Sequence, residues 1–530
     1  MRMKRLAALM MVCAVAASAM TGCKGKYAAS NQTAATAAEG SSAAEGSEAA
    51  EETKVPKDTL QVAIIQDMVT MDPQETNLAT NWAVQRQMYN HLVHENPDGT
   101  VDPELATEWE FLDDLTLRMK LRDDVYFHNG NHFTAEDVLF MIQRAKQTSI
   151  SASTFESFDA ENTKIVDDYT IDIKFNKPYA AVFNTFSSGR GSVVSKQYVE
   201  EVGAVEAAIK PVGTGPYKFV SWETGTELRF EANEDYWDKE NIPKTKNLVF
   251  KVVSEAANRV IELETGNVDL AFEISGGDVD RVNSIPGCHA DVSDSNRYML
   301  VTYSMKDPIL GPNKDLRYAM SYAIDRQGII DSVYNGQSTL ATGMYPSNVF
   351  AFEEIPDFLP YDLDLAKEYM AKAGYPDGGL DFNFSVESRE IDLKIAEALK
   401  AMWAELGINV NIIEGNDSAY TGQGYEFQVG LRAGNANEPS NILIIYDSAF
   451  GSKIQPNDDW IDEHLALAKT KYDAEERAAE YKEIQKYLYD IRYTAPMLYT
   501  PVIFGVSDKI EGFVTEPLQQ VDLNSVVVYE

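Results

Sequence analysis

The chain contains few cysteines. Its 530 residues include three, and two of these, Cys13 and Cys23, lie near the amino terminus. The rest of the chain has Cys288 alone and therefore cannot form an internal disulfide. We expect its stability to come from a large apolar core, which a chain of this length can bury.

Basic residues are also few. Lysine and arginine total 46 against 83 aspartates and glutamates, which gives a formal net charge of −37. Such a surface repels nucleic acid and anionic lipid, so we expect no nucleic-acid partner. The acidic residues are spread along the chain, so the charge indicates a solvated surface and does not identify a ligand.

The sequence lacks the short motifs of several enzyme classes. It has no G-x-S-x-G, no H-E-x-x-H, no Walker loop and no dinucleotide fingerprint. Gly213-Thr-Gly215 is no phosphate loop, because Pro216 removes an amide and a strand is expected to follow. We predict a tight turn there, with close backbone approach. The abundant carboxylates leave a glycosidase pair open, but no constellation supports an enzyme.

Histidine is scarce as well, with six residues in the chain. His91 and His94 are spaced three apart, and His128 and His132 flank a turn. Neither pair has a nearby cysteine or a third histidine to complete a metal site. We therefore predict neither a bound metal nor a cofactor.

No long hydrophobic run is present. After a basic start, residues 6–20 form an apolar stretch of about fifteen residues, too short to span a bilayer and typical of a signal peptide. It ends in Met20-Thr-Gly-Cys23, which resembles the lipobox of bacterial lipoproteins and predicts lipidation of Cys23. Cleavage after Ala17-Ser-Ala19, which would give a secreted protein, is the alternative. Residues 24–57 are rich in Ala, Ser, Gly and Glu and predict a flexible tether.

The body alternates strand and helix patterns. Residues 60–65 predict a strand, and residues 82–92 a helix. Thr134-Ala-Glu-Asp137 predicts a capping box at the start of a helix. Apolar periodicity predicts a helix over 395–406, directly followed by an alternating strand over 408–412. Such succession indicates an α/β fold. A long helix is also predicted from Asp473 to about residue 489.

Several of these stretches carry a resemblance. Residues 121–128 read LRDDVYFH and precede the Thr134 motif, residues 317–326 read RYAMSYAIDR, and residues 211–237 run from PVGTGPY to NEDYW. In this order they resemble the peptide/nickel-type solute-binding proteins of ABC importers, extracellular solute-binding protein family 5. The resemblance extends from about Leu60 to about Phe513.

The resemblance implies an α/β fold similar to type II periplasmic binding proteins, with two large lobes around a hinged cleft and a smaller inserted lobe. The chain would cross between the large lobes near Tyr298 and Tyr499. The expected limits are 1–22 for the signal peptide, 23–57 for the lipidated cysteine and tether, 58–95, 211–298 and 499–530 for lobe I, 96–210 for lobe II and 299–498 for lobe III.

The resemblance also places the ligand site. Peptide-binding relatives hold the ligand's α-ammonium with an aspartate upstream of a proline that aligns with Pro439, and Asn435 occupies that position here. An asparagine supplies no charge for the ammonium, so either Glu438 replaces it or the ligand has no free amine. Arg432 and Arg389 are candidates for a carboxylate, with ordinary surface pairing as the alternative. The other candidate ligand contacts are Asn81, Trp82, Asn437, Trp460 and Tyr499, of which Trp82 and Trp460 could equally be core residues.

We therefore expect a monomeric, lipid-anchored receptor on the extracytoplasmic face of the cell membrane. It would capture an oligopeptide or similar small polar ligand by lobe closure and deliver it to an ABC permease and ATPase complex. The alternatives are the same fold with an oligosaccharide or a nickel or other metal chelate, and an anchored hydrolase.

Overall fold

The computed structural model describes residues 54–415 except 97, residues 429–435, residues 438–515 except 451, 453 and 455, and residues 521–530. For residues 432–435 it describes the backbone. Cys23, the tether up to residue 53 and Asn437 lie outside the described residues.

The described residues form several hydrophobic cores. We name three regions after them. The first region packs around Leu60, Phe250 and Phe504, the inserted region around Phe133, Met141 and Phe158, and the third region around Leu300, Trp403 and Leu488. A smaller core around Val260 and Val282 belongs to the first region. The buried residues of the inserted core lie between Leu92 and Val193, and most of them fall within the predicted lobe II, 96–210; the lobe limits remain a prediction.

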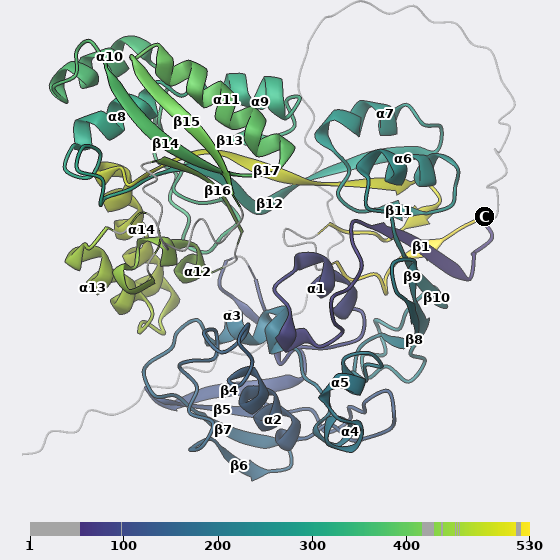
Figure 1. Ribbon diagram of the computed structural model, residues 1–530. Helices are drawn as coiled ribbons and strands as arrows, with labels where there is room; N and C mark the ends of the chain where they lie inside the picture. The colour runs from purple at the N-terminus through teal and green to yellow at the C-terminus, as the bar shows by residue number, and fades with distance from the viewer. Residues whose placement is uncertain are drawn as a thin grey trace, which may run out of the picture. The chain divides into compact units, whose positions relative to one another are not determined.

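An 11-stranded sheet links the first and third regions (Figure 1). Its order is β15-β14-β16-β12-β17-β11-β1-β10-β9-β8, with β13 paired to β17. A separate four-stranded sheet, β4-β5-β7-β6, belongs to the inserted region. The first region contains β1 (Thr59–Ile64), α1 (Ala79–Gln85), β8 (Tyr217–Glu223), β9 (Glu227–Ala232), β10 (Asn247–Val252), α6 (Ala256–Glu264), β11 (Leu270–Ala271), α7 (Val279–Asn283), β18 (Ile510–Glu511) and β19 (Val527–Val528).

The remaining elements belong to the other two regions. The inserted region contains β2 (Val93–Glu95), β3 (Val101–Pro103), β4 (Ala106–Asp113), β5 (Thr116–Leu121), α2 (Ala135–Ala145), β6 (Lys164–Asp167), β7 (Thr170–Lys174), α3 (Val182–Ser187), the short helix Gly189–Gly191, α4 (Lys196–Val202) and α5 (Ala204–Ala207). The third region contains α8 (Lys314–Tyr322), α9 (Arg326–Val333), β13 (Thr339–Leu340), α10 (Leu363–Lys372), β14 (Leu380–Glu387), α11 (Glu390–Ala404), β15 (Ile408–Gly415), β16 (Val429–Asn435), α12 (Pro439–Leu443), α13 (Asp459–Ala468) and α14 (Ala474–Ile491).

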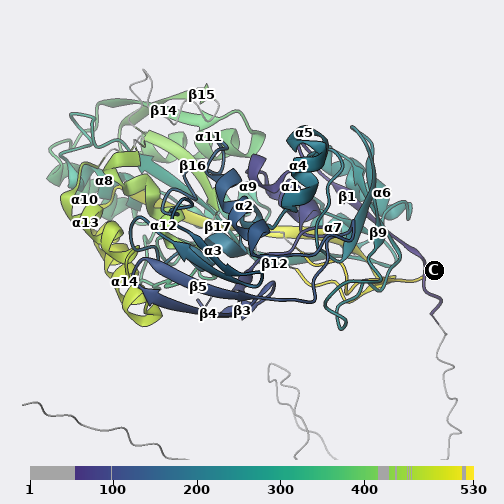
Figure 2. The same cartoon turned by 90° about the horizontal axis from the view of Figure 1, so that it is seen from below.

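Two long strands, β12 (Cys288–Tyr303) and β17 (Thr494–Ser507), pass from one large core to the other. They pair with each other along both halves, and the register shifts between Ser293 and Arg297. Tyr298 lies opposite Tyr499 beside this shift. In Figures 1 and 2 both strands run from the side of α8 and α11 to the side of α6 and α7. A second shift lies between Met299 and Leu300, so the crossing is a two-stranded link with two irregularities.

Local sequence signals explain several elements. The capping box at the start of α2 is confirmed: the backbone amide of Thr134 donates to Asp137 Oδ2 at 2.9 Å. The turn at Gly213-Thr-Gly215 is confirmed as a close approach, because a Cβ on Gly213 would lie 2.0 Å from the carbonyl oxygen of Met88. Only glycine fits there.

The helix predicted over residues 82–92 is wrong in its limits, because α1 spans Ala79–Gln85. The carbonyls of Gln87 and Met88 accept hydrogen bonds from the amides of Tyr217 and Gly215, at 2.8 Å each. Those carbonyls are thus used by a distant segment and not by a further helical turn. His94 lies in β2.

Candidate functional site

The segment with the predicted ligand contacts begins at the crossing. β16 pairs antiparallel with β12, so that Asn435 lies opposite Arg297 and Arg432 opposite Leu300. Arg297 also lies opposite Thr500 of β17. Asn435, the candidate ammonium-binding residue, is thus the last residue of β16, and it lies beside the register shift between β12 and β17. The side chains of Arg432 and Asn435 lie outside what the structure describes.

Glu438 is buried, with 1% of its surface exposed. It caps α12, where its Oε1 accepts from the amide of Ser440 at 3.5 Å, and it accepts from the Tyr481 hydroxyl at 2.8 Å. These bonds hold its carboxylate against α14. Its role as a replacement for the missing aspartate remains a prediction.

A second carboxylate faces Glu438 from the inserted region. Glu95, at the end of β2, lies with Oε1 3.8 Å from Nη2 of Arg477 on α14. Burial and the charge of Glu438 raise the pKa of Glu95 to about 7, although Arg477 opposes the shift. Arg477 also donates to the carbonyl of Ala180 at 2.9 Å. Two carboxylates and one guanidinium thus meet at the contact between the inserted and third regions, and sequence reasoning missed this cluster.

The hydroxyl of Tyr499 forms hydrogen bonds with other residues of the protein. Its hydroxyl donates to the carbonyl of Tyr345 at 2.9 Å and accepts from the amides of Thr342 and Gly343 at 3.2 and 3.1 Å. Burial raises its pKa to about 12. In this structure Tyr499 fixes the loop after β13, and its contact with a ligand remains a prediction.

Two other candidates also have partners within the protein. Trp460 stacks on His464 and Tyr487, with ring centroids 3.8 and 4.1 Å apart. Arg389 forms ion pairs with Glu387 and Asp392 at 3.1 and 2.8 Å. Both placements agree with the structural alternatives stated for them. Neither placement tests ligand contact.

Asn81 and Trp82 lie on α1 beside the inserted region. Asn81 is buried and donates to the carbonyl of Thr70 at 3.4 Å, while its Oδ1 has no partner among the described residues. The ring of Trp82 lies 5.3 Å from the guanidinium of Arg190. Sequence reasoning missed Arg190, although its position between Gly189 and Gly191 was a local signal for a closely packed turn.

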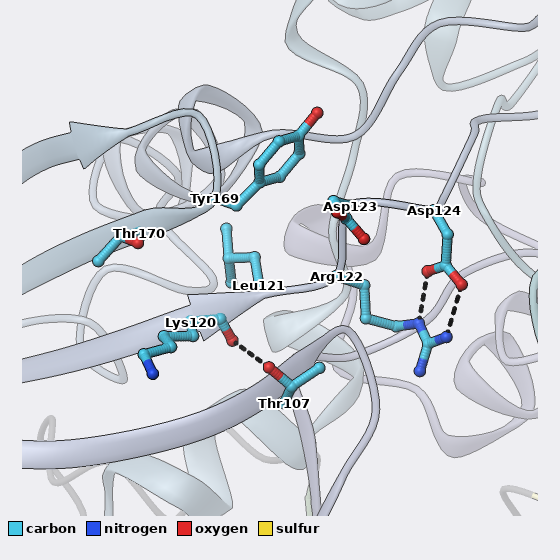
Figure 3. A pocket seen from close by; sticks show the side chains of 8 residues that line it. All are labelled: Thr107, Lys120, Leu121, Arg122, Asp123, Asp124, Tyr169 and Thr170. Atoms are coloured by element: carbon cyan, nitrogen blue, oxygen red, sulfur yellow. Dashed lines mark hydrogen bonds and ion pairs between the residues drawn. The ribbon is translucent and has the colours of Figure 1, made fainter.

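A surface pocket of about 350 Å³ lies elsewhere, on the sheet of the inserted region (Figure 3). One end holds Arg122, paired with Asp124 at 2.7 Å, and Thr107 donates to the carbonyl of Lys120 at 3.3 Å. None of the predicted ligand residues lines it. The pocket therefore does not support the predicted site.

The described residues offer no metal site and no membrane-spanning helix. No group of three or more His, Cys, Asp or Glu side chains there has the arrangement to hold a metal ion. In the same residues, no helix has the length and apolarity needed to cross a membrane.

Comparison with known proteins identifies the family. Residues 100–453 match the bacterial extracellular solute-binding proteins, family 5 Middle, and the chain therefore belongs to that family, whose members serve ABC importers. It is 29% identical to heme-binding protein A of Haemophilus influenzae, over 82% of this chain and 86% of that protein. It is 26% identical to the glutathione-binding protein GsiB of Salmonella paratyphi A, over 85% and 91%.

A solved relative supports the fold directly. The periplasmic binding protein DppA from Helicobacter pylori, solved with the peptide STSA, superposes with a TM-score of 0.74 at 25% identity, over 91% of this chain and 100% of that chain. The expected type II periplasmic-binding fold is confirmed. These relatives are binding proteins by name, which supports a non-enzymatic role.

Proposed function

We propose that the chain is the lipid-anchored receptor of an ABC importer that captures an oligopeptide, or a small ligand with peptide-like amides, and presents it to the permease. Capture makes and breaks no covalent bond. The ligand contacts the first and third regions together, and the free energy of these contacts favours the closed arrangement of the two regions.

One observation carries this proposal. Residues 432–438 are the segment whose sequence departs from peptide-binding relatives. This segment begins on β16, where Asn435 lies opposite Arg297 of β12, and Arg297 also lies opposite Thr500 of β17. A ligand bound at the end of β16 would therefore lie beside the link between the two large cores. The solved relative with a bound peptide supports the ligand class.

The ligand can be identified by native mass spectrometry of the purified protein, followed by calorimetric titration with tripeptides and tetrapeptides. We expect one peptide per chain, released unchanged. Catalytic turnover of the bound peptide would contradict a receptor and favour the anchored hydrolase. Stoichiometric binding of an oligosaccharide or metal chelate, without peptide binding, would contradict the ligand class.

The anchor has its own test. We expect metabolic labelling with palmitate to mark the wild-type chain in the membrane fraction, and Cys23→Ser to abolish the label and release the protein. An unlabelled wild-type chain in the medium would support cleavage after Ala19.

Asn435 offers a test of amine recognition. Asn435→Asp adds a carboxylate at the position where peptide-binding relatives carry one, so we expect about tenfold tighter binding of free-amine peptides and no change for N-acetylated peptides. The matched control is Asn411→Asp, on the exposed side of β15. Equal affinities of the wild-type and Asn435→Asp chains for free-amine peptides would remove Asn435 from the site.

A further inference from the structure

Arg190 lies against Trp82 at the junction of the inserted and first regions. Its guanidinium is 5.3 Å from the centre of the indole ring. A Cβ on the preceding residue, Gly189, would lie 2.3 Å from that ring, so the close approach requires glycine. The stack therefore depends on glycine at position 189, and it brings a cation from one region onto an aromatic ring of another.

This cation has no acidic partner among the described residues. The structure gives it one polar contact, from Nη1 to the Thr154 hydroxyl at 3.3 Å. Its Nε is buried without an acceptor, and so is Nε1 of Trp82. Burial lowers the pKa of Arg190, with no neighbouring carboxylate to offset the effect. A buried charge or donor left unpaired is costly, so such groups usually have a partner.

Other arginines show how unusual this is in a chain with 83 acidic residues. Arg144 is paired with Asp72, and the buried Arg317 donates to several backbone carbonyls. Arg492 also lacks an acidic partner among the described residues, but it is 1% exposed and lies against two tyrosine rings. Arg190, by contrast, is only half-buried.

We propose that Arg190 and Trp82 form a subsite for the terminal carboxylate of the ligand. Thr154 accepts from Nη1, and Nε has no acceptor among the described residues, so the edge formed by Nε and Nη2 is the unpaired side of the guanidinium. That edge would donate two parallel hydrogen bonds to a carboxylate that displaces the groups now covering Nε. The Trp82 indole N–H is a third donor. Because Trp82 belongs to the first region and Arg190 to the inserted region, one carboxylate would contact both.

This inference rests on the proposed function, and it goes beyond it by naming the group that recognises one end of the ligand. The competing explanation is that the stack of Arg190 on Trp82 only stabilises the contact between the inserted and first regions. A purely stabilising role predicts that changing Arg190 lowers the stability of the fold, and that ligand affinity does not depend on the charge of the ligand's terminus.

The test uses tripeptides and tetrapeptides that bind the wild-type chain, each as the C-terminal acid and as the C-terminal amide. Affinities are measured by calorimetry on wild type, Arg190→Gln and Trp82→Phe. We expect the wild type to prefer the acid by about thirtyfold and Arg190→Gln by less than about threefold, because the charge-assisted bonds are lost. Trp82→Phe, which keeps a ring and loses the N–H, should fall between them.

Arg118→Gln is the matched control, since Arg118 lies in the same region and pairs with Asp172 on its surface. It should keep the wild-type ratio of acid to amide binding. If Arg190→Gln does not fold, Arg190→Lys and Trp82→Phe provide the same ratio, and both should lower it.

Two failures are distinguishable. If the wild type binds acids and amides equally, or if the Arg190 and Trp82 variants keep its ratio, the subsite is wrong and peptide capture stands. If the wild type binds neither form of any peptide, the proposed function fails and the subsite fails with it.

Discussion

The inserted region contacts its two neighbours in different ways. Toward the first region, Arg144 pairs with Asp72, and Gln74 donates to the carbonyls of Arg190 and Ser192 at 3.1 and 3.0 Å. Toward the third region, Glu95 pairs with Arg477 at 3.8 Å, and the buried carboxylate of Glu438 lies close enough to raise the pKa of Glu95. The Arg144–Asp72 pair of the first contact is balanced in charge, whereas the second contact places two carboxylates beside one guanidinium.

The difference indicates which contact can open. A buried ion pair with satisfied hydrogen bonds is costly to separate, because each charge would lose its partner. An excess buried carboxylate instead favours separation, since opening returns it to water. We infer that the inserted region stays with the first region while the third region moves about β12 and β17.

The largest expected effect comes from breaking the contact with the third region. Arg477→Met leaves Glu95 and Glu438 buried without a cation, so we expect a loss of about 3–5 kcal/mol in the free energy of unfolding, measured by urea denaturation. It should also weaken ligand binding.

Arg144→Met is the matched change on the other contact. It should destabilise the fold to a similar extent but, at a temperature where it is folded, keep the ligand affinity. Equal losses of affinity in both variants would mean that the two contacts do not differ in function.

A smaller effect concerns the proton on Glu95. Because its pKa is raised to about 7, the folded chain binds this proton more tightly than the unfolded chain. The stability that the proton confers is present at acidic pH and is lost as pH rises from about 5 through 7. Glu95→Gln removes this dependence, so its stability relative to wild type should rise by up to about 3 kcal/mol across that range.

Denaturation at several pH values measures this difference. Four other titratable groups face the Glu95–Glu438 cluster, namely Arg477, Tyr481, Tyr179 and Tyr345. The tyrosines have raised pKa values and stay neutral in this range. If stability changes with pH in the same way for wild type and Glu95→Gln, the proton is not bound at Glu95.

The smallest expected effect concerns the contact between the inserted and first regions. The Ser151 hydroxyl donates to the carbonyl of Gln74 at 2.6 Å in a buried position. Ser151→Ala should cost about 1 kcal/mol of stability and leave ligand affinity unchanged. A change in affinity without a change in stability would show that this contact moves during capture.

Sequence alone predicted the elements whose signals are local. The predicted strand over 60–65 and the helix and strand over 395–412 correspond to β1, α11 and β15, because their apolar periodicity and end signals lie within a few residues. The helix over 82–92 failed because the carbonyls of Gln87 and Met88 bond to the segment around Gly215, far along the chain.

The same distinction applies to the site. The motif around Pro439 located the segment that begins at the crossing, but the burial of Glu438 depends on Tyr481 and Glu95 from other elements. Arg190 matters because of Trp82, a neighbour in space and not in sequence. Such pairs become visible only when the fold places them together.

Closure of the third region is tested most directly by the distance between the inserted and third regions in solution. Fluorophores can be attached to cysteines at the exposed positions Glu161 and Glu397, with the native cysteines changed to serine, and followed by single-molecule energy transfer. We expect the ligand found by mass spectrometry to shift the chain to one population of higher energy transfer, with a midpoint equal to the calorimetric Kd. Unchanged transfer at saturating ligand would contradict capture by closure of the third region.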